Sequence, residues 1–143
     1  MRRDLSYIHK DAKIGKDVVI DPFASISADV VIGDGTWIGS NVVIMDGARI
    51  GENCKIYPGA VISAVSQDLK YKGEDSTLII GNNNVIRENV TISKGTKADN
   101  LTTQIGNSNL FMNGTHIAHD CQIGNQNIFA TNAAIAGHAK ILN

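Results

Sequence analysis

The sequence has 143 residues, which is enough for one domain with a modest hydrophobic core. Its 13 Lys and Arg residues nearly balance 14 Asp and Glu residues, so no overall positive field attracts nucleic acid or anionic lipid. Two cysteines cannot build a disulfide framework and no apolar run approaches the ~20 residues of a membrane-spanning helix, so we expect a soluble, cytoplasmic protein.

Isoleucine recurs every six residues along most of the chain. The positions run from Ile8 to Ile62 without a gap, return in the same phase over 80–92 and continue, after a slip of one residue, from Ile105 to Ile141. This large column has 20 members, of which 18 are Ile and two are Phe. A second column, two residues earlier, is small or β-branched almost throughout. Such regularity indicates one structural unit repeated along the chain.

A period of six matches neither the 3.6-residue turn of an α-helix nor the plain alternation of a two-faced sheet. It is typical of the hexapeptide parallel β-helix, in which three hexapeptides form one triangular coil. Residues 18 apart then stack in successive coils about 4.8 Å apart, and the large column fills the axis of the prism. We predict a single all-β domain over residues 1–143, a parallel β-helix of six to seven coils. An all-β sandwich is the weaker alternative, because it needs hairpin turns and irregularly spaced strands.

Two polar segments interrupt the repeat, and both are predicted to loop out of the coil. Residues 63–79 put Asp68 and Glu74 at axial positions, and residues 93–104 absorb the slip of one residue. The first loop either replaces two faces of a coil or is an extra insertion, because both arrangements preserve the phase. Glycine often follows the large residue, as at Gly51, which suggests corners with unusual backbone angles.

The repeat also gathers groups that suit proton transfer. His119 and Asp120 follow the axial Ile117 by two and three positions, so both side chains point outward. Counting 18 residues onward from Asp120 stacks His138 over its carboxylate, and the same count from His119 brings Gly137 over the imidazole. A histidine oriented by a carboxylate is a common general base, and a backbone N–H without a side chain over it suits an oxyanion. The alternative is that these are solvated histidines on a polar face.

A metal site is a second alternative. His116, His119 and His138 could supply three nitrogen ligands to zinc. His116 and His119 lie on opposite sides of Ile117, however, and Asp120 suits proton transfer equally well, so we predict no metal. The sequence lacks the Gly-x-Ser-x-Gly elbow and the Walker phosphate loop, so direct attack by a substrate hydroxyl fits better than a covalent enzyme intermediate.

Four segments of the sequence belong together. They are Thr-His-Ile-Ala-His-Asp-Cys-Gln-Ile-Gly at 115–124, Gln-Asp-Leu-Lys-Tyr-Lys-Gly-Glu at 67–74, Ile-Arg-Glu-Asn-Val-Thr-Ile at 86–92 and Ala-Gly-His at 136–138. Together they resemble the family of acyl-[acyl-carrier-protein]–UDP-N-acetylglucosamine O-acyltransferases, which catalyse the first acyl transfer of lipid A biosynthesis. The resemblance covers essentially the whole chain and implies a left-handed β-helix and an acyltransferase activity.

The resemblance also implies roles for individual residues. His119 would be the general base that deprotonates the sugar 3-hydroxyl as this group attacks the thioester of a 3-hydroxyacyl chain. Asp120 would orient His119, and the Gly137 amide would stabilise the oxyanion. Contacts to the nucleotide sugar and the acyl-pantetheine chain are implied, without a division of roles, for Asp68, Lys70, His116 and His138.

The implied acceptor is UDP-N-acetylglucosamine, and the implied donor is an acyl carrier protein. The donor carries its own phosphopantetheine, so no further cofactor is expected. Members of this family are homotrimers with active sites in the clefts between chains. They continue into further coils, which carry the residues that measure the acyl chain, and into a C-terminal helical domain. Both parts are absent here, so we expect a truncated chain.

Two other functions are alternatives. An acetyl-CoA-dependent hexapeptide acetyltransferase would use the same fold and a similar mechanism, but its donor would be coenzyme A. An inactive, truncated solenoid would only oligomerise.

Overall fold

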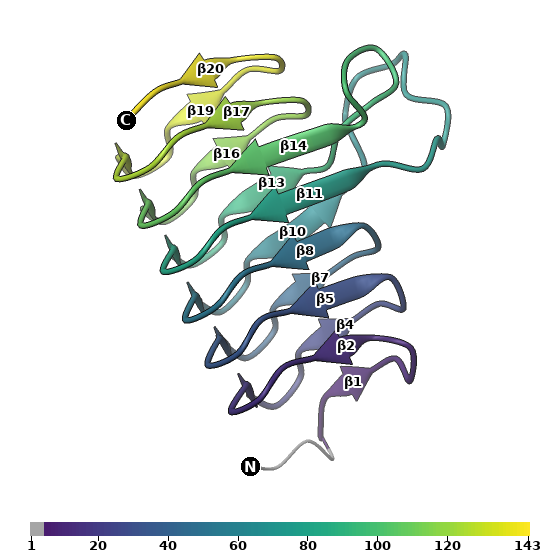
Figure 1. Cartoon of the computed structure of the whole chain (residues 1–143), viewed down its shortest axis with the longest axis vertical. Coiled ribbons are helices and arrows are strands. Elements are labelled where there is room, and N and C mark those ends of the chain that lie inside the picture. The colour runs from purple at the N-terminus through teal and green to yellow at the C-terminus, as the bar shows by residue number, and fades with distance from the viewer. Residues whose placement is uncertain (1–4) are drawn as a thin grey trace.

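The structure is a computed structural model and describes residues 5–143, so the first four residues of the predicted domain lie outside it. Twenty short strands follow the isoleucine repeat through this part of the chain. They stack into three parallel sheets, named A, B and C here, around one axis (Figure 1). Between residues 5 and 143 the chain forms no helix that could cross a membrane.

Each sheet takes every third strand. Sheet A consists of β1 (Tyr7–Ile8), β4 (Ser25–Ile26), β7 (Val43–Ile44), β10 (Val61–Ala64), β13 (Thr91–Ser93), β16 (His116–Ile117) and β19 (Ala134–Ile135). Sheet B consists of β2 (Lys13–Ile14), β5 (Val30–Ile32), β8 (Ala48–Ile50), β11 (Thr77–Ile80), β14 (Thr102–Ile105), β17 (Gln122–Ile123) and β20 (Lys140–Ile141). Sheet C consists of β3 (Val19–Ile20), β6 (Trp37–Ile38), β9 (Lys55–Ile56), β12 (Val85–Ile86), β15 (Leu110–Phe111) and β18 (Ile128–Phe129).

Neighbouring strands in a sheet are successive coils of the chain. Ile8 pairs with Ile26, which lies 18 residues later. Across the first loop Ile50 pairs with Ile80, so the offset grows to 30. β10 in sheet A is followed directly by β11 in sheet B, and no face of the coil is missing. The first loop is therefore an extra insertion at one corner, which settles the choice that the sequence left open.

The coil is left-handed, as the family resemblance implied. In Figure 1 the strands of sheet B face the viewer and run from right to left, while the chain climbs from β1 to β20. A path that runs leftward in front as it rises describes a left-handed turn.

The large column fills the axis and forms the core. From Ile20 to Ile123 its side chains are at most 4% exposed. Its two phenylalanines, Phe111 and Phe129, stack face to face with ring centroids 4.9 Å apart. Burial of one such side chain stabilises a fold by about 1.5–3 kcal/mol, so the column is the main source of stability. The predicted all-β parallel helix with an isoleucine axis is confirmed.

The two excursions are shorter than predicted. The first loop comprises residues 65–76 instead of 63–79, and the second comprises residues 94–101 instead of 93–104. Strand pairing resumes before the axial isoleucine returns, because Leu78 already points into the core and pairs with the coils on both sides.

The prediction about the glycines was wrong. Gly51, Gly81 and Gly106 do not have the left-handed backbone, which is found instead at corner residues such as Asn41 and Asn53. These glycines stack on one another at the corner between sheets B and C. A Cβ on Gly51 would lie 2.5 Å from the carbonyl oxygen of Gly81. The close approach of one coil's backbone to the next, and not the backbone angle, excludes a side chain here.

Both loops leave the coil at the corner between sheets A and B. The first loop connects β10 to β11, and the second connects β13 to β14 one coil later (Figure 1). The corresponding corners of the next two coils, residues 118–121 and 136–139, follow in the same stack. This corner, named the A–B corner below, is where the chain departs most from its repeat.

We expect Ile86→Ala to lower the free energy of unfolding by about 4 kcal/mol, because Ile86 is fully buried on the axis and its truncation leaves a cavity. Ile128→Ala is the matched control. Ile128 precedes the axial Phe129 directly but is 70% exposed, so its truncation should cost less than about 1 kcal/mol. Urea denaturation followed by circular dichroism measures both losses, and equal losses would contradict the six-residue phase.

Candidate active site

Two successive turns at the A–B corner bring the predicted catalytic residues together. His119 and Asp120 follow β16, and Gly137 and His138 follow β19. The His138 N–H donates to the His119 carbonyl at 3.1 Å, which fixes one turn on the other. Asp120 and His138 both have the left-handed backbone, with φ of 61° and 63°, a conformation in which Asp and His are enriched.

Asp120 meets the His119 ring at Nδ1 and is held by four hydrogen bonds. Its Oδ2 is 2.9 Å from His119 Nδ1 and accepts the Thr96 hydroxyl at 2.6 Å. Its Oδ1 accepts the Thr96 N–H at 2.8 Å. The Asp120 N–H donates to the Thr103 hydroxyl oxygen at 2.8 Å. The side chain is fully buried, so these bonds replace water completely.

The pKa of the Asp120 carboxyl lies below its ordinary value. Burial is the largest single influence and acts to raise this pKa, but the hydrogen bonds from Thr96 and His119 together outweigh it. At neutral pH Asp120 is therefore a carboxylate, and its Oδ2 accepts a hydrogen bond from the Nδ1–H group of His119. With the proton on Nδ1, the lone pair of Nε2 is free to accept another.

The backbone of Gly137, which carries no side chain, packs against the His119 ring. A Cβ at this position would lie 2.6 Å from both Cε1 and Nε2 of the imidazole, closer than any side chain tolerates. Only glycine therefore fits over His119 in its present orientation.

Asp68 approaches the other nitrogen of the His119 ring from the first loop. Its Oδ2 lies 3.7 Å from Nε2, which is longer than a hydrogen bond. The Asp68 main chain is held within its own loop, because its N–H donates to Ser66 Oγ at 3.1 Å and its carbonyl accepts the Tyr71 N–H at 2.9 Å. The His119 side chain is 13% exposed, so the site is partly shielded from water.

His138 lies one coil beyond Asp120, as predicted, and one of its ring nitrogens comes within 4.8 Å of an Asp120 oxygen, but the ring bonds to a different residue. Its ring meets the His119 ring edge-on, with centroids 5.0 Å apart, and its Nδ1 bonds to Asp99 Oδ2 at 2.9 Å. The physical reason lies in the second loop. Thr96 of this loop already occupies the Asp120 carboxylate, and Asp99 of the same loop offers His138 another partner.

Of the remaining two predicted residues, Lys70 is bonded to this cluster, because its N–H donates to Asp68 Oδ1 at 2.9 Å, whereas His116 lies apart from it. Lys70 lines a hollow of about 310 Å³ between the two loops, together with Asp68 and Thr96. His116 lies on the outer face of sheet A, in register with Thr91, and its Nδ1 bonds to the Thr91 hydroxyl at 2.8 Å.

Three residues of the loops support the site although the sequence alone assigned them no role in it. Thr96 holds Asp120, Asp99 holds His138, and Glu74 ties the loops together by accepting the Lys97 N–H at 3.0 Å and the Lys72 N–H at 2.7 Å. The hydrogen bonds from the backbone N–H groups of Lys97 and Lys72 lower the pKa of Glu74. No sequence signal could have found these contacts, because residues outside the repeat have no phase that fixes their height or direction.

His119, Asp120 and His138 could each offer one ligand atom to a metal, and these atoms lie within 4.8 Å of one another. Both Asp120 oxygens, however, already accept hydrogen bonds from Thr96 and face His119. The donor set therefore suits proton transfer better than metal binding, and the absence of a metal stays a prediction.

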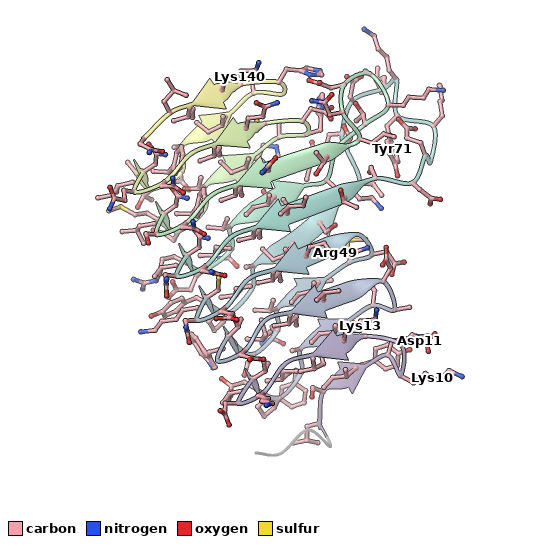
Figure 2. The ribbon with its side chains drawn as sticks, in the orientation of Figure 1. Lys10, Asp11, Lys13, Arg49, Tyr71 and Lys140 are labelled. Carbon is pink, nitrogen blue, oxygen red and sulfur yellow. The ribbon has the colours of Figure 1, made fainter. Side chains whose placement is uncertain are left out.

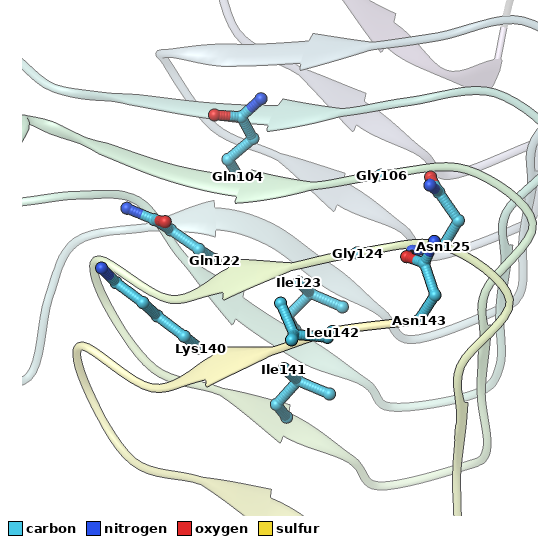
Figure 3. Close-up of a pocket in the computed structure, with 10 residues that line it drawn as sticks. All are labelled: Gln104, Gly106, Gln122, Ile123, Gly124, Asn125, Lys140, Ile141, Leu142 and Asn143. Carbon is cyan, nitrogen blue, oxygen red and sulfur yellow. Dashed lines mark hydrogen bonds between the residues drawn. The ribbon is translucent and has the colours of Figure 1, made fainter.

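A larger hollow of about 680 Å³ lies elsewhere, on sheet B of the last coils. Figure 3 shows Gln104, Gln122 and Lys140 on successive strands along one side of it, and Ile141 and Leu142 also line it. Lys140 is the one ionisable side chain in its lining, so this hollow lacks the paired groups that proton transfer needs.

Comparison with known proteins gives one family and a set of close relatives. The profile of the bacterial transferase hexapeptide family (six repeats) matches residues 11–36, 29–64 and 102–137. An acyl-[acyl-carrier-protein]–UDP-N-acetylglucosamine O-acyltransferase from Paracoccus denitrificans is 47% identical over 79 residues, which cover 55% of this chain and 30% of that protein. The Aliivibrio fischeri protein of the same name is 45% identical over 82 residues, or 57% of this chain and 31% of that protein.

Solved structures superpose over nearly the whole chain. LpxA from Acinetobacter baumannii has a TM-score of 0.94 and 48% identity, covering 95% of this chain and 53% of that one. The LpxA of Bacteroides fragilis, a UDP-N-acetylglucosamine acyltransferase, has a TM-score of 0.83 and 50% identity, covering 99% of this chain and 58% of that one. The chain thus spans about half the length of these solved relatives, and its matches to the curated ones cover about a third of theirs.

We expect Asp120→Asn to be less stable than the parent by about 2 kcal/mol at pH 7, because it loses a charged acceptor of hydrogen bonds. Folding lowers the Asp120 pKa, so this stabilisation is complete above the unfolded pKa of about 3.9 and is lost as the pH falls through the folded value. The difference between the two proteins should shrink at low pH.

Denaturant unfolding at a series of pH values measures this difference. The exposed carboxylate variant Asp75→Asn is the control and should differ little from the parent at any pH. An Asp120→Asn deficit that persists undiminished at the lowest pH would contradict a native carboxylate.

Proposed function

The chain belongs to the bacterial transferase hexapeptide family, and on that premise we propose that it is an acyltransferase. The proposed reaction moves a 3-hydroxyacyl group from an acyl carrier protein to the 3-hydroxyl of UDP-N-acetylglucosamine, the first step of lipid A biosynthesis. The support is the name of relatives that are 45–48% identical, together with a site suited to removing a proton from a hydroxyl group. The proposed location is the cytoplasm.

The single observation that carries the proposal is the His119 ring held between Asp120 and the Gly137 backbone. His119 Nε2 accepts the proton of the sugar 3-hydroxyl as the oxygen attacks the thioester carbonyl. Asp120 accepts the Nδ1–H bond and stabilises the imidazolium that forms. The Gly137 amide stabilises the tetrahedral oxyanion. When the intermediate collapses, the C–S bond breaks and His119 returns its proton to the departing thiolate.

Four further residues are proposed to bind the substrates. Asp68 and Lys70 belong to the first loop, and the Asp68 carboxylate lies 3.7 Å from His119 Nε2, within reach of a hydroxyl bound there. His138 lines the same corner, and His116 lies on the neighbouring face of sheet A. The donor carries its own phosphopantetheine, so the proposal includes no other cofactor.

The assembly proposed is a homotrimer, and the faces of the prism support it. The outward side chains of sheet A include no Asp, Glu, Lys or Arg in any described strand; they are Tyr7, Ser25, Val43, Val61, Thr91, His116 and Ala134. Sheet B instead directs Lys13, Arg49 and Lys140 outward, as Figure 2 shows. An uncharged face suits contact with another copy. Sheet A against a neighbour would put the A–B corner at the rim of a cleft between chains.

We expect His119→Ala to reduce the rate of 3-O-acyl transfer by about 10²–10⁴-fold, because a positioned general base contributes that much. His9→Ala is the matched control, since His9 lies in the first coil and should leave the rate unchanged. The assay follows the 3-O-acyl product from UDP-N-acetylglucosamine, with an acylated carrier protein and an acyl-CoA as competing donors.

Each outcome of this assay separates the alternatives. Equal rates for parent and His119→Ala would remove His119 from the mechanism. Preference for acyl-CoA would identify the acetyl-CoA type of transferase, and no turnover by the parent would favour the inactive scaffold.

We expect sedimentation to give three times the chain mass for the parent and a smaller species for Val61→Lys, because a buried lysine at an interface is left unpaired. Ile79→Lys is the matched control, since Ile79 points outward on sheet B and is 40% exposed. Dissociation by Ile79→Lys alone would assign the interface to sheet B.

A further inference from the structure

One short loop, residues 94–101, orients both imidazoles of the site. Asp99 bonds to His138 Nδ1 at 2.9 Å. Thr96 bonds twice to Asp120, which in turn holds His119. We propose that Thr96 is a positioning residue of the catalytic pair and sets the charge and direction of the Asp120 carboxylate through its hydroxyl. The catalytic meaning of this role rests on the proposed function, but the role itself does not.

The hydroxyl and the N–H group of Thr96 both donate to the Asp120 carboxylate. The residue is 3% exposed, and its hydroxyl donates to the same oxygen, Asp120 Oδ2, that faces His119 Nδ1. Its N–H donates to the other oxygen, Oδ1. Thr96 thus bonds both carboxylate oxygens, so the carboxylate cannot rotate away from the imidazole without losing one of these hydrogen bonds.

Thr96 is itself fixed by the loop around it. Its carbonyl accepts the N–H groups of Asp99 at 3.3 Å and Leu101 at 3.0 Å, which closes the loop on its own base. The next residue, Lys97, donates its N–H to Glu74 of the first loop at 3.0 Å. Thr96 therefore stands at the point where both loops meet the coil, and its two donors are aimed before any substrate arrives.

A donor to Oδ2 has a defined chemical effect. It favours the ionised form of Asp120, which must be an acceptor to hold the proton on His119 Nδ1. Without the hydroxyl, Oδ2 would keep only the imidazole as a partner, and a carboxylic acid or a rotated carboxylate would compete with the present arrangement. The Nδ1–H form of His119, which leaves Nε2 free to act as base, would then be less populated.

The test compares Thr96→Val with Thr96→Ser in the whole chain. Valine removes the hydroxyl at nearly constant volume and keeps the backbone N–H, whereas serine restores the donor. Nuclear magnetic resonance of ¹⁵N-labelled histidine gives the tautomer of His119, and the ¹³C signal of the Asp120 carboxyl gives its titration. We expect Thr96→Val to shift the Asp120 titration upward and to reduce the Nδ1–H population of His119. Thr96→Ser should resemble the parent.

Thr36→Val is the matched control for structural loss. Thr36 is equally buried and its hydroxyl donates to the Gly51 carbonyl at 2.8 Å, far from the site. It should destabilise the chain without changing either resonance. If Thr96→Val lowers the unfolding temperature as Thr36→Val does, but leaves Asp120 and His119 as in the parent, the positioning role is overturned.

Kinetics give a separate readout. If the parent turns over, Thr96→Val should lower kcat by about tenfold with KM little changed, because orientation and not binding is lost. If the parent shows no turnover but Thr96→Val still shifts the Asp120 titration and the His119 tautomer, the proposed reaction is overturned and the positioning role of Thr96 stands.

Discussion

The structure depends on one constraint, the spacing of hydrogen-bonded parallel strands from coil to coil. Each corner lies about 4.8 Å above the one before it, so a side chain at one height has the backbone of the next coil as its neighbour. At the corner between sheets B and C this spacing leaves no room for a Cβ on the stacked glycines. At the A–B corner it brings Gly137 directly over His119 and ties the His138 N–H to the His119 carbonyl. The site is therefore a product of the same spacing that builds the fold.

The A–B corner shows how a regular solenoid acquires irregular chemistry. The loops at 65–76 and 94–101 are inserted between sheets A and B in successive coils, and the axial isoleucines on both sides keep their pairing. Because the core does not depend on them, the loops can carry polar residues without loss of the packed axis. They supply Asp68 on one side of the His119 ring, and Thr96 supports Asp120 on the other.

Sequence alone predicted what the period controls. The axis, the three sheets and the stacking of Gly137 on His119 all follow from counting, because those residues have a fixed phase. The direction of the His138 ring does not follow from counting, because the ring bonds to Asp99, a loop residue that has no fixed phase in the repeat. Thr96 and Glu74 were missed for the same reason. From the sequence we explained the corner glycines by their backbone angles, but the close backbone of the next coil is the reason for them. A repeated glycine shows that a side chain is excluded, but it does not show which of these two causes excludes it.

The most direct measurement is the nuclear Overhauser effect between the His119 ring protons and the two Hα protons of Gly137. These residues are 18 positions apart, and their contact exists only if successive coils stack at that offset. We expect a strong cross-peak and Hα signals displaced by the ring current of the imidazole. If the cross-peak is missing, or if the ring contacts a different corner residue instead, the stacking that assembles the site is contradicted.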